Sequence, residues 1–345
     1  MSKVISIKNK AQSGKFVISL DFELYWGMHD VYKVEEYEKN IFGAHLAVPE
    51  ILKLFSAYNI EATWAVVGMM NFKTLDELKS NLPSELPNYE TEKLSAYYLM
   101  NQEYCDTYHA KLLFAPELIK LIEETPGQEL GSHTFSHYYV LEKGQSINEF
   151  KADAEQFSNI MNTSENCMKS IIFPRNQINQ EYLSVCHDMG FLTYRGNEKG
   201  WVYQIKASDR QNYLKRGLRL MDMYINLFGY QSYKLDLVSN NKLLNIKGSR
   251  QLKPVSISLK WLERRRLKRI LNSMTHAAKK GEIYHLWWHP HNFGVQLDEN
   301  LAFLKEILEH YQLLKERYNF QSINMKGIAF EQINDSALEK NINEG

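Results

Sequence analysis

Two carboxylates, Asp21 and Glu23, stand two residues apart at the end of the apolar run FVISLDF, residues 16–22. Such a run is typical of a buried strand, whose successive side chains point to opposite faces. Asp21 and Glu23 therefore share a face, and Phe22 points away from it. One such carboxylate can bind a metal ion while the other accepts a proton. The plainer interpretation is a solvated strand end, or a carboxylate that caps a loop.

Two histidines, His133 and His137, follow a short strand and a Gly-Ser turn. Their four-residue spacing is that of neighbours on one turn of a helix. Two neutral imidazoles at this spacing can hold one divalent cation. We therefore predict that both are metal ligands, against the alternative that they are structural histidines of the core or the surface.

Arg175 follows an apolar run that ends in a proline. Its planar guanidinium could pair with a carboxylate, lowering the pKa of that group or fixing its rotamer. Asn176, the next residue, is predicted to contact the substrate.

A late run, YHLWWHPHNFG, residues 284–294, carries further histidines. Strand alternation places Trp287 and His289 on one face. A histidine can protonate a leaving amine, which makes His289 a candidate general acid, with His285 and His291 as rivals. Trp287 is a candidate platform for a sugar ring, and we also expect His291 to contact the substrate.

The candidate residues can act together only if the strands that precede them end at the same edge of a sheet. Strands are predicted at 16–22, 62–67, 128–132, 170–173, 191–194 and 283–288, and helices at 35–58, 116–124, 146–161, 181–189 and 300–318. Alternating strands and helices predict a parallel sheet of an α/β protein, whose active site lies at the carboxyl ends of the strands. The stretches at about 71–113 and 200–258 interrupt the alternation and are predicted to be insertions.

Several motifs resemble those of one family. HTFSH at 133–137 matches the pattern H-[ST]-x-x-H, ATWAVVG at 62–68 resembles a second strand, and FPRNQ at 173–177 and LWWH at 286–289 resemble an arginine and a late histidine motif. YRGNEKGW at 194–201 is a weaker match. Together they resemble the polysaccharide deacetylases, the NodB-homology or carbohydrate esterase 4 group. The opening SLDFELYWG resembles the branch found in surface-polysaccharide and O-antigen biosynthesis.

The resemblance implies one domain over residues 1–345, a distorted (β/α) barrel of about seven parallel strands with both insertions near its mouth. It implies hydrolysis of an N-acyl group, acetyl or formyl, from an amino sugar. The ion would be Zn²⁺, with Fe²⁺ or Co²⁺ as alternatives, held by a carboxylate and the two histidines.

The family's usual opening has adjacent aspartates, whereas this chain has Phe22 after Asp21. By position Asp21 corresponds to the base and Glu23 takes the ligand role, although the reverse division is open. Arg175 would orient Asp21. No clear counterpart exists for the aspartate that orients the late histidine, and Glu198 is a possible substitute.

The charge of the chain limits which classes of binding partner are expected. The 345 residues carry 41 basic and 41 acidic side chains. The stretch 242–280 nevertheless holds twelve Lys and Arg against the single acid Glu263. It is predicted to be either a solvated helix face or a dock for a diphosphate or an anionic membrane. No stacking platform accompanies the charge, so nucleic acid is not an expected partner.

The first residues lack the apolar run of a signal peptide, so we expect a cytoplasmic protein, with peripheral membrane contact as an alternative. The leading hypothesis is a metal-dependent N-deacylase of a small or lipid-linked amino sugar in surface-polysaccharide biosynthesis. The rivals are a metal-free amide hydrolase of ureide-like molecules on the same fold, and an inactive glycan-binding or membrane-surface protein.

Overall fold

The computed structural model describes residues 13–102, 105, 108–161, 168–205, 213–235 and 243–343. The strands are β1 (Lys15–Phe22), β2 (Ala62–Val66), β3 (Gln128–Ser132), β4 (Ser170–Ile171), β5 (Thr193–Tyr194), β6 (Leu244–Asn245), β7 (Arg250–Gln251), β8 (Ile283–Trp288) and β9 (Gln321–Ser322). The α-helices are α1 (Val34–Tyr58), α2 (Leu75–Lys79), α3 (Ala96–Met100), α4 (Ala110–Leu113), α5 (Pro116–Glu124), α6 (Ile147–Met161), α7 (Gln180–Asp188), α8 (Tyr213–Asp222), α9 (Lys260–Lys280), α10 (Leu297–Tyr318) and α11 (Met325–Asn343).

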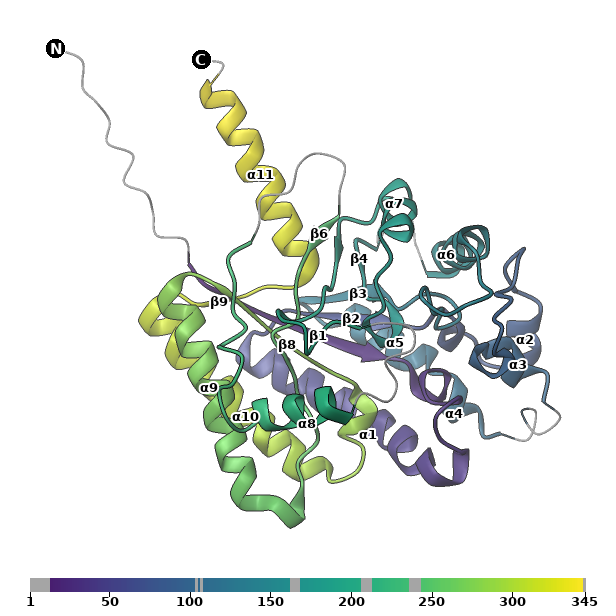
Figure 1. Cartoon of the computed structure of the whole chain (residues 1–345), viewed down its shortest axis with the longest axis horizontal. Coiled ribbons are helices and arrows are strands. Elements are labelled where there is room, and N and C mark those ends of the chain that lie inside the picture. Colours follow the sequence, from purple (N-terminus) through teal and green to yellow (C-terminus); the bar gives the residue numbers. More distant parts are fainter. Residues whose placement is uncertain are drawn as a thin grey trace.

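The strands form one curled parallel sheet in the order β6-β5-β4-β3-β2-β1-β8-β7, with β9 beside the start of β1. The prediction of a distorted (β/α) barrel is confirmed. About seven strands were expected, and the described chain has eight on the main path. Figure 1 shows α1, α9 and α10 lying together along one side of the sheet.

The central strand, β1, is buried along almost its whole length, because helices and neighbouring strands cover it on every side. Its apolar residues Phe16, Ile18 and Leu20 belong to the main hydrophobic core. β1 lies between β2 and β8. Parallel pairing therefore brings the carboxyl ends of β1, β2, β3 and β8 to the same edge, where the predicted site residues follow the strands.

The prediction of an insertion over 200–258 needs correction, because its last part belongs to the sheet. Leu244 and Ile246 donate backbone hydrogen bonds to the strand containing β5, while Ser249 and Leu252 donate to β8. One extended segment thus pairs first with one edge of the sheet and then with the other. Short strands without strong alternation gave no sequence signal for this pairing.

The segment 71–113 contains α2, α3 and α4 and contacts the region that follows the strands. The indole Nε1 of Trp26 donates to the carbonyl of Leu113 at 2.7 Å. The backbone N–H of Tyr139 donates to the hydroxyl of Tyr89 at 2.8 Å. These contacts place this segment close to the loop that carries His137.

Candidate active site

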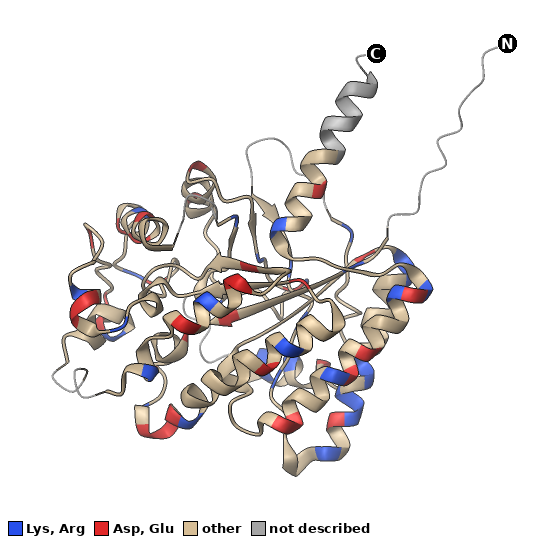
Figure 2. Cartoon of the chain, turned by 180° about the vertical axis from the view of Figure 1, so that it is seen from behind, with Lys and Arg blue, Asp and Glu red and all other residues tan. Residues whose placement is uncertain are grey.

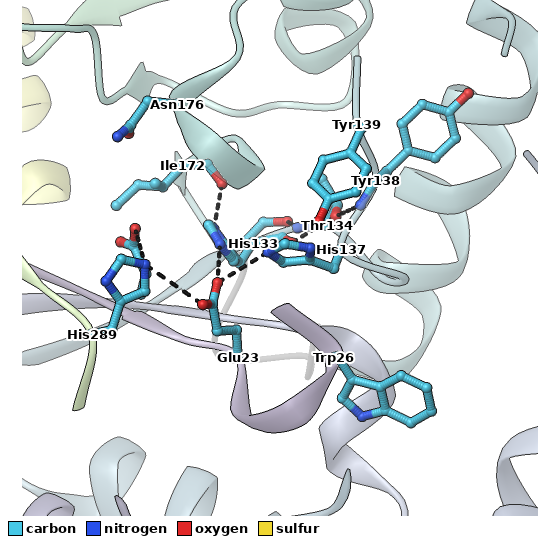
Figure 3. Close-up of polar contacts among 12 residues, drawn as sticks. Glu23, Trp26, His133, Thr134, His137, Tyr138, Tyr139, Ile172, Asn176 and His289 are labelled. Carbon is cyan, nitrogen blue, oxygen red and sulfur yellow. Dashed lines mark hydrogen bonds and ion pairs between the residues drawn. The ribbon is translucent and has the colours of Figure 1, made fainter. Parts of the chain in front are cut away.

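Glu23, His133 and His137 converge in a buried cluster at the ends of β1 and β3 (Figure 3). Glu23 Oε2 lies 3.2 Å from His133 Nε2 and 3.0 Å from His137 Nε2. All three side chains are buried, and one ligand atom of each lies within 4.8 Å of the others. A carboxylate and two imidazoles are a common ligand set for a catalytic zinc ion.

The protonation pattern of this cluster fits a bound cation. His133 Nδ1 lies 2.7 Å from the carbonyl oxygen of Ile172, which can only accept, so Nδ1 is the donor of this contact. When Nδ1 carries the only proton of the ring, His133 Nε2 presents a lone pair to Glu23 Oε2, and two facing lone pairs repel. A cation between them would turn this repulsion into attraction.

Electrostatics favours a charged Glu23 carboxylate facing a neutral His137 ring. Burial lowers the pKa of His137 to about 4, so its ring is neutral at pH 7. Burial alone would raise the pKa of Glu23, but the surrounding histidines, His289 first among them, hold it well below its usual range. An ionised carboxylate and neutral imidazoles are the forms that bind a metal ion.

The loop that carries both histidines is not the helical turn that their spacing suggested. Thr134 and His137 have left-handed φ values of 64° and 57°, which turn the chain back on itself. The buried carboxylate of Asp153, on α6, accepts backbone hydrogen bonds from Phe135 at 2.8 Å and Ser136 at 3.0 Å. A helix would have satisfied these N–H groups internally, whereas here another element must do so.

Asp21 lies beside this cluster and belongs to a different ion pair. Arg195, which directly follows β5, donates from both terminal nitrogens to the two Asp21 oxygens, each at 2.7 Å. Burial acts to raise the pKa of Asp21, but Arg195 and nearby histidines hold it below its usual range. The cluster that could hold a metal therefore contains Glu23 and not Asp21.

The predicted contact between Arg175 and Asp21 is wrong. Arg175 pairs instead with Asp30 and lies 4.2 Å above the ring of Tyr139, which packs edge-on against His137. A role of Arg175 in a reaction stays a prediction. Arg195 was missed, although its position directly after a strand, in the stretch that weakly matched the family, was a usable signal.

Asn176 contributes to this arrangement through Arg195. Its side-chain oxygen accepts hydrogen bonds from Arg195 Nε at 3.1 Å and Nη2 at 2.7 Å. Asn176 therefore holds the guanidinium against Asp21. It also lines a neighbouring cavity, so contact with a substrate stays open to test.

His289 is the most accessible imidazole of the cluster, with 21% of its side chain exposed. Its Nε2 lies 3.7 Å from Asp21 Oδ2 and 3.6 Å from Glu23 Oε1. The rings of Trp287 and His289 pack edge to face, as expected for two residues on one face. Glu198 accepts a hydrogen bond from Trp287 Nε1 at 3.1 Å, and the described carboxylates within 4 Å of His289 Nε2 are those of Asp21 and Glu23.

The two rival histidines are enclosed. His285 Nε2 lies 2.8 Å from Ser19 Oγ inside the barrel, and burial beside Arg195 lowers the pKa of His285 to about 3. His291 is buried between His289 and Tyr37, and burial also lowers its pKa to about 3. Among the three late histidines, His289 is thus the one that a substrate can reach.

The basic stretch divides into two sets, and Lys242 lies outside the described residues. Arg250, Arg266 and Arg269 are buried, and each pairs with Asp222 or Glu263. The other Lys and Arg positions of α9 are blue bands along its ribbon in Figure 2. Part of the predicted dock is therefore internal structure.

Sequence and structure comparisons agree with this geometry. The family model described as polysaccharide deacetylase matches residues 42–194, so this part of the chain resembles the polysaccharide deacetylases, as the sequence motifs predicted. No curated protein sequence matches the chain significantly.

Solved structures share the fold. A protein from Mycobacterium smegmatis described as a polysaccharide deacetylase has a TM-score of 0.56 at 13% identity, covering 94% of this chain and 92% of its own. One from Pseudomonas aeruginosa PAO1, also described as a polysaccharide deacetylase, has a TM-score of 0.52 at 11% identity, covering 92% and 90%. The Puue allantoinase has a TM-score of 0.53 at 12% identity, covering 91% and 88%.

Within the described residues, no helix is both long and apolar enough to cross a membrane.

Proposed function

We propose that this protein is a metal-dependent hydrolase that removes an N-acyl group, acetyl or formyl, from an amino sugar in surface-polysaccharide biosynthesis, in the cytoplasm. The observation that carries the proposal is the buried Glu23, His133 and His137 cluster beside the ion pair of Asp21 and Arg195. The match of residues 42–194 to the polysaccharide deacetylase family model supports the reaction class. The O-antigen context rests on the resemblance of the opening motif alone.

Glu23, His133 and His137 would hold the cation, most plausibly Zn²⁺, with Fe²⁺ and Co²⁺ as alternatives. Such an ion polarises a carbonyl and lowers the pKa of a water molecule towards ~7. The Asp21 carboxylate, fixed by both arms of Arg195, would accept the proton of that water. Because Asp21 keeps its charge in a buried site, it can act without first losing a proton.

His289 would donate a proton to the departing sugar amine. Its Nε2 is within 4 Å of both carboxylates, and its side chain remains accessible. Trp287 lies beside it with its indole held by Glu198, which suits a wall against the apolar face of a sugar.

Metal analysis combined with an activity assay tests the proposal. Purified wild type should contain about one Zn, Fe or Co per chain and release acetate or formate from N-acetylated or N-formylated amino sugars. The double variant His133→Ala, His137→Ala should lose both metal and activity. His187→Ala removes a half-exposed histidine of α7 and should lose neither.

His289→Ala separates catalysis from metal binding. It should lower kcat by about 10²–10⁴-fold while the metal content stays at the wild-type level. A wild type that cannot be loaded with metal but still hydrolyses a ureide would establish the metal-free amide hydrolase instead. Sugar binding with no turnover, despite full metal loading, would establish the inactive glycan-binding protein.

A further inference from the structure

A cavity of about 660 Å³ opens beside Trp287 and Asn176, next to the candidate active site. Its opposite wall is formed by α8, which lies near the end of β8 in Figure 1. Because Trp287 borders both the cavity and His289, a molecule whose reacting group lies at His289 can extend into this space.

The wall of this cavity is strongly cationic. Arg216, Arg219, Arg250 and Lys253 line it, and Glu198 is the one acid among the described lining residues. Desolvation by the cavity wall and the neighbouring Arg219 and Arg216 hold the pKa of the Lys253 ammonium group below its usual range.

The arginines of the cavity wall differ in whether a described carboxylate pairs with them. The charge of Arg250 is matched by Asp222 at 2.9 Å. Arg216 and Arg219 project from α8 into the cavity wall, and no described carboxylate lies in ion-pair distance of either. Arginine guanidinium groups bind phosphate oxygens through paired charge-assisted hydrogen bonds.

α8 carries exposed apolar side chains both at the cavity and away from it. Tyr213 and Leu220 line the cavity and are 73% and 56% exposed, whereas Leu214 and Met221 lie outside its lining and are 67% and 50% exposed. The helix is anchored through Asp222, which accepts hydrogen bonds from the Tyr203 hydroxyl and from two backbone N–H groups. An anchored helix with both arginines and exposed apolar residues has the composition of an interfacial membrane helix.

We propose that this cavity binds the phosphate group of a lipid-linked amino sugar, with Arg216 and Arg219 on the phosphate and the lipid along the exposed apolar side chains of α8. This inference rests on the proposed function, because the sugar must reach His289 from the cavity. The positive charge of the cavity wall favours an anionic group such as a phosphate. The exposed apolar side chains of α8 favour a lipid over a nucleotide as the carrier of that phosphate.

Calorimetric titration of the whole metal-loaded chain tests the phosphate contact. The probes are farnesyl phosphate, UMP and inorganic phosphate. Farnesyl phosphate should bind most tightly, and Arg216→Gln with Arg219→Gln should weaken it by about tenfold or more. Lys120→Gln, which removes an exposed cation of α5, should leave its Kd unchanged. Equal binding by the double arginine variant and wild type would overturn the phosphate site.

Two further variants test the lipid contact. Leu214→Gln with Met221→Gln should lower the affinity for farnesyl phosphate to that of inorganic phosphate, whose own Kd should not change. UMP binding as tightly as farnesyl phosphate would overturn the lipid assignment in favour of a nucleotide carrier. Unchanged farnesyl phosphate binding in this variant would also overturn it, leaving the exposed apolar side chains of α8 for a protein contact.

The titrations do not depend on turnover. Arginine-dependent phosphate binding by a protein that hydrolyses no N-acyl sugar would uphold this site while the proposed reaction fails. Hydrolysis of neutral N-acyl sugars without phosphate binding would do the reverse.

Discussion

At the residue scale, the two buried carboxylates of the site have different partners. Asp21 is paired with Arg195, whereas Glu23 is paired with imidazoles, those of His133, His137 and His289, and with no Lys or Arg among the described residues. A buried carboxylate without a positively charged or hydrogen-bonding partner is costly, so the partners of each carboxylate decide what it can do. The arrangement explains why Glu23 is the carboxylate available to a metal ion and why Asp21 is free to accept a proton.

Arg195→Gln should lower the free energy of unfolding by about 3–5 kcal/mol, because it leaves the buried Asp21 unpaired. Arg195→Lys keeps the charge but loses the two-pronged contact, so its loss should be smaller. Urea unfolding of both variants measures the difference. Arg175→Gln should leave the geometry around Asp21 intact, and a loss of catalytic activity equal to that of Arg195→Gln would contradict the assignment of the orienting role to Arg195.

At the element scale, the loop from His133 to His137 depends on α6. Its backbone N–H groups at Phe135 and Ser136 donate to Asp153, a residue that no predicted motif included. Burial raises the pKa of Asp153 to about 6, so the carboxylate is ionised above that pH. The positions of the two candidate histidine ligands, His133 and His137, therefore depend on the carboxylate of Asp153, which lies 16 residues after His137 in the chain.

Asp153→Asn replaces one accepting oxygen by an amide NH₂ that faces an N–H group. The expected loss is about 1–3 kcal/mol of stability, together with weaker metal retention on dialysis against a chelator. Asp188→Asn, at an exposed carboxylate of α7, should match wild type in both measurements. Full metal retention by Asp153→Asn at wild-type stability would show that the loop holds its shape without this carboxylate.

At the scale of the whole molecule, His289 is positioned by a contact between α1 and the turn that follows β8, which are about 250 residues apart in the chain. α1 packs against the turn that follows His289, where Asn40 donates to the carbonyl of His291 at 3.4 Å. A Cβ atom on Gly43 would lie 2.2 Å from the Cα of Gly294. The two backbones can approach this closely only because both residues are glycines.

Gly43→Ala should therefore lower the free energy of unfolding by about 1–3 kcal/mol and reduce kcat by displacing His289. Gly217→Ala is the matched control, since Gly217 is also within a helix and has no atom within 4 Å of its added Cβ. That control should be neutral or more stable by up to about 1 kcal/mol. Thermal unfolding compares the two, and equal stability would show that α1 can shift to accommodate the methyl group.

The sequence by itself determined the features that depend on local periodicity. Strand alternation placed Asp21 near Glu23, both within 4 Å of His289, and Trp287 beside His289, while the pattern of strands and helices predicted the parallel sheet. These predictions needed no knowledge of distant parts of the chain, because side-chain direction along a strand follows from backbone geometry.

Only the tertiary structure decided which arginine meets Asp21, how the sheet edges connect and what shapes the histidine loop. Arg175 and Asn176 both have positive φ, so the chain turns after Pro174 and sends Arg175 to Asp30, while Asn176 holds Arg195. The strands β6 and β7 are two residues each and form because the edges of the sheet supply their hydrogen-bond partners. Such contacts join residues far apart in sequence, and they exist only once the barrel has closed.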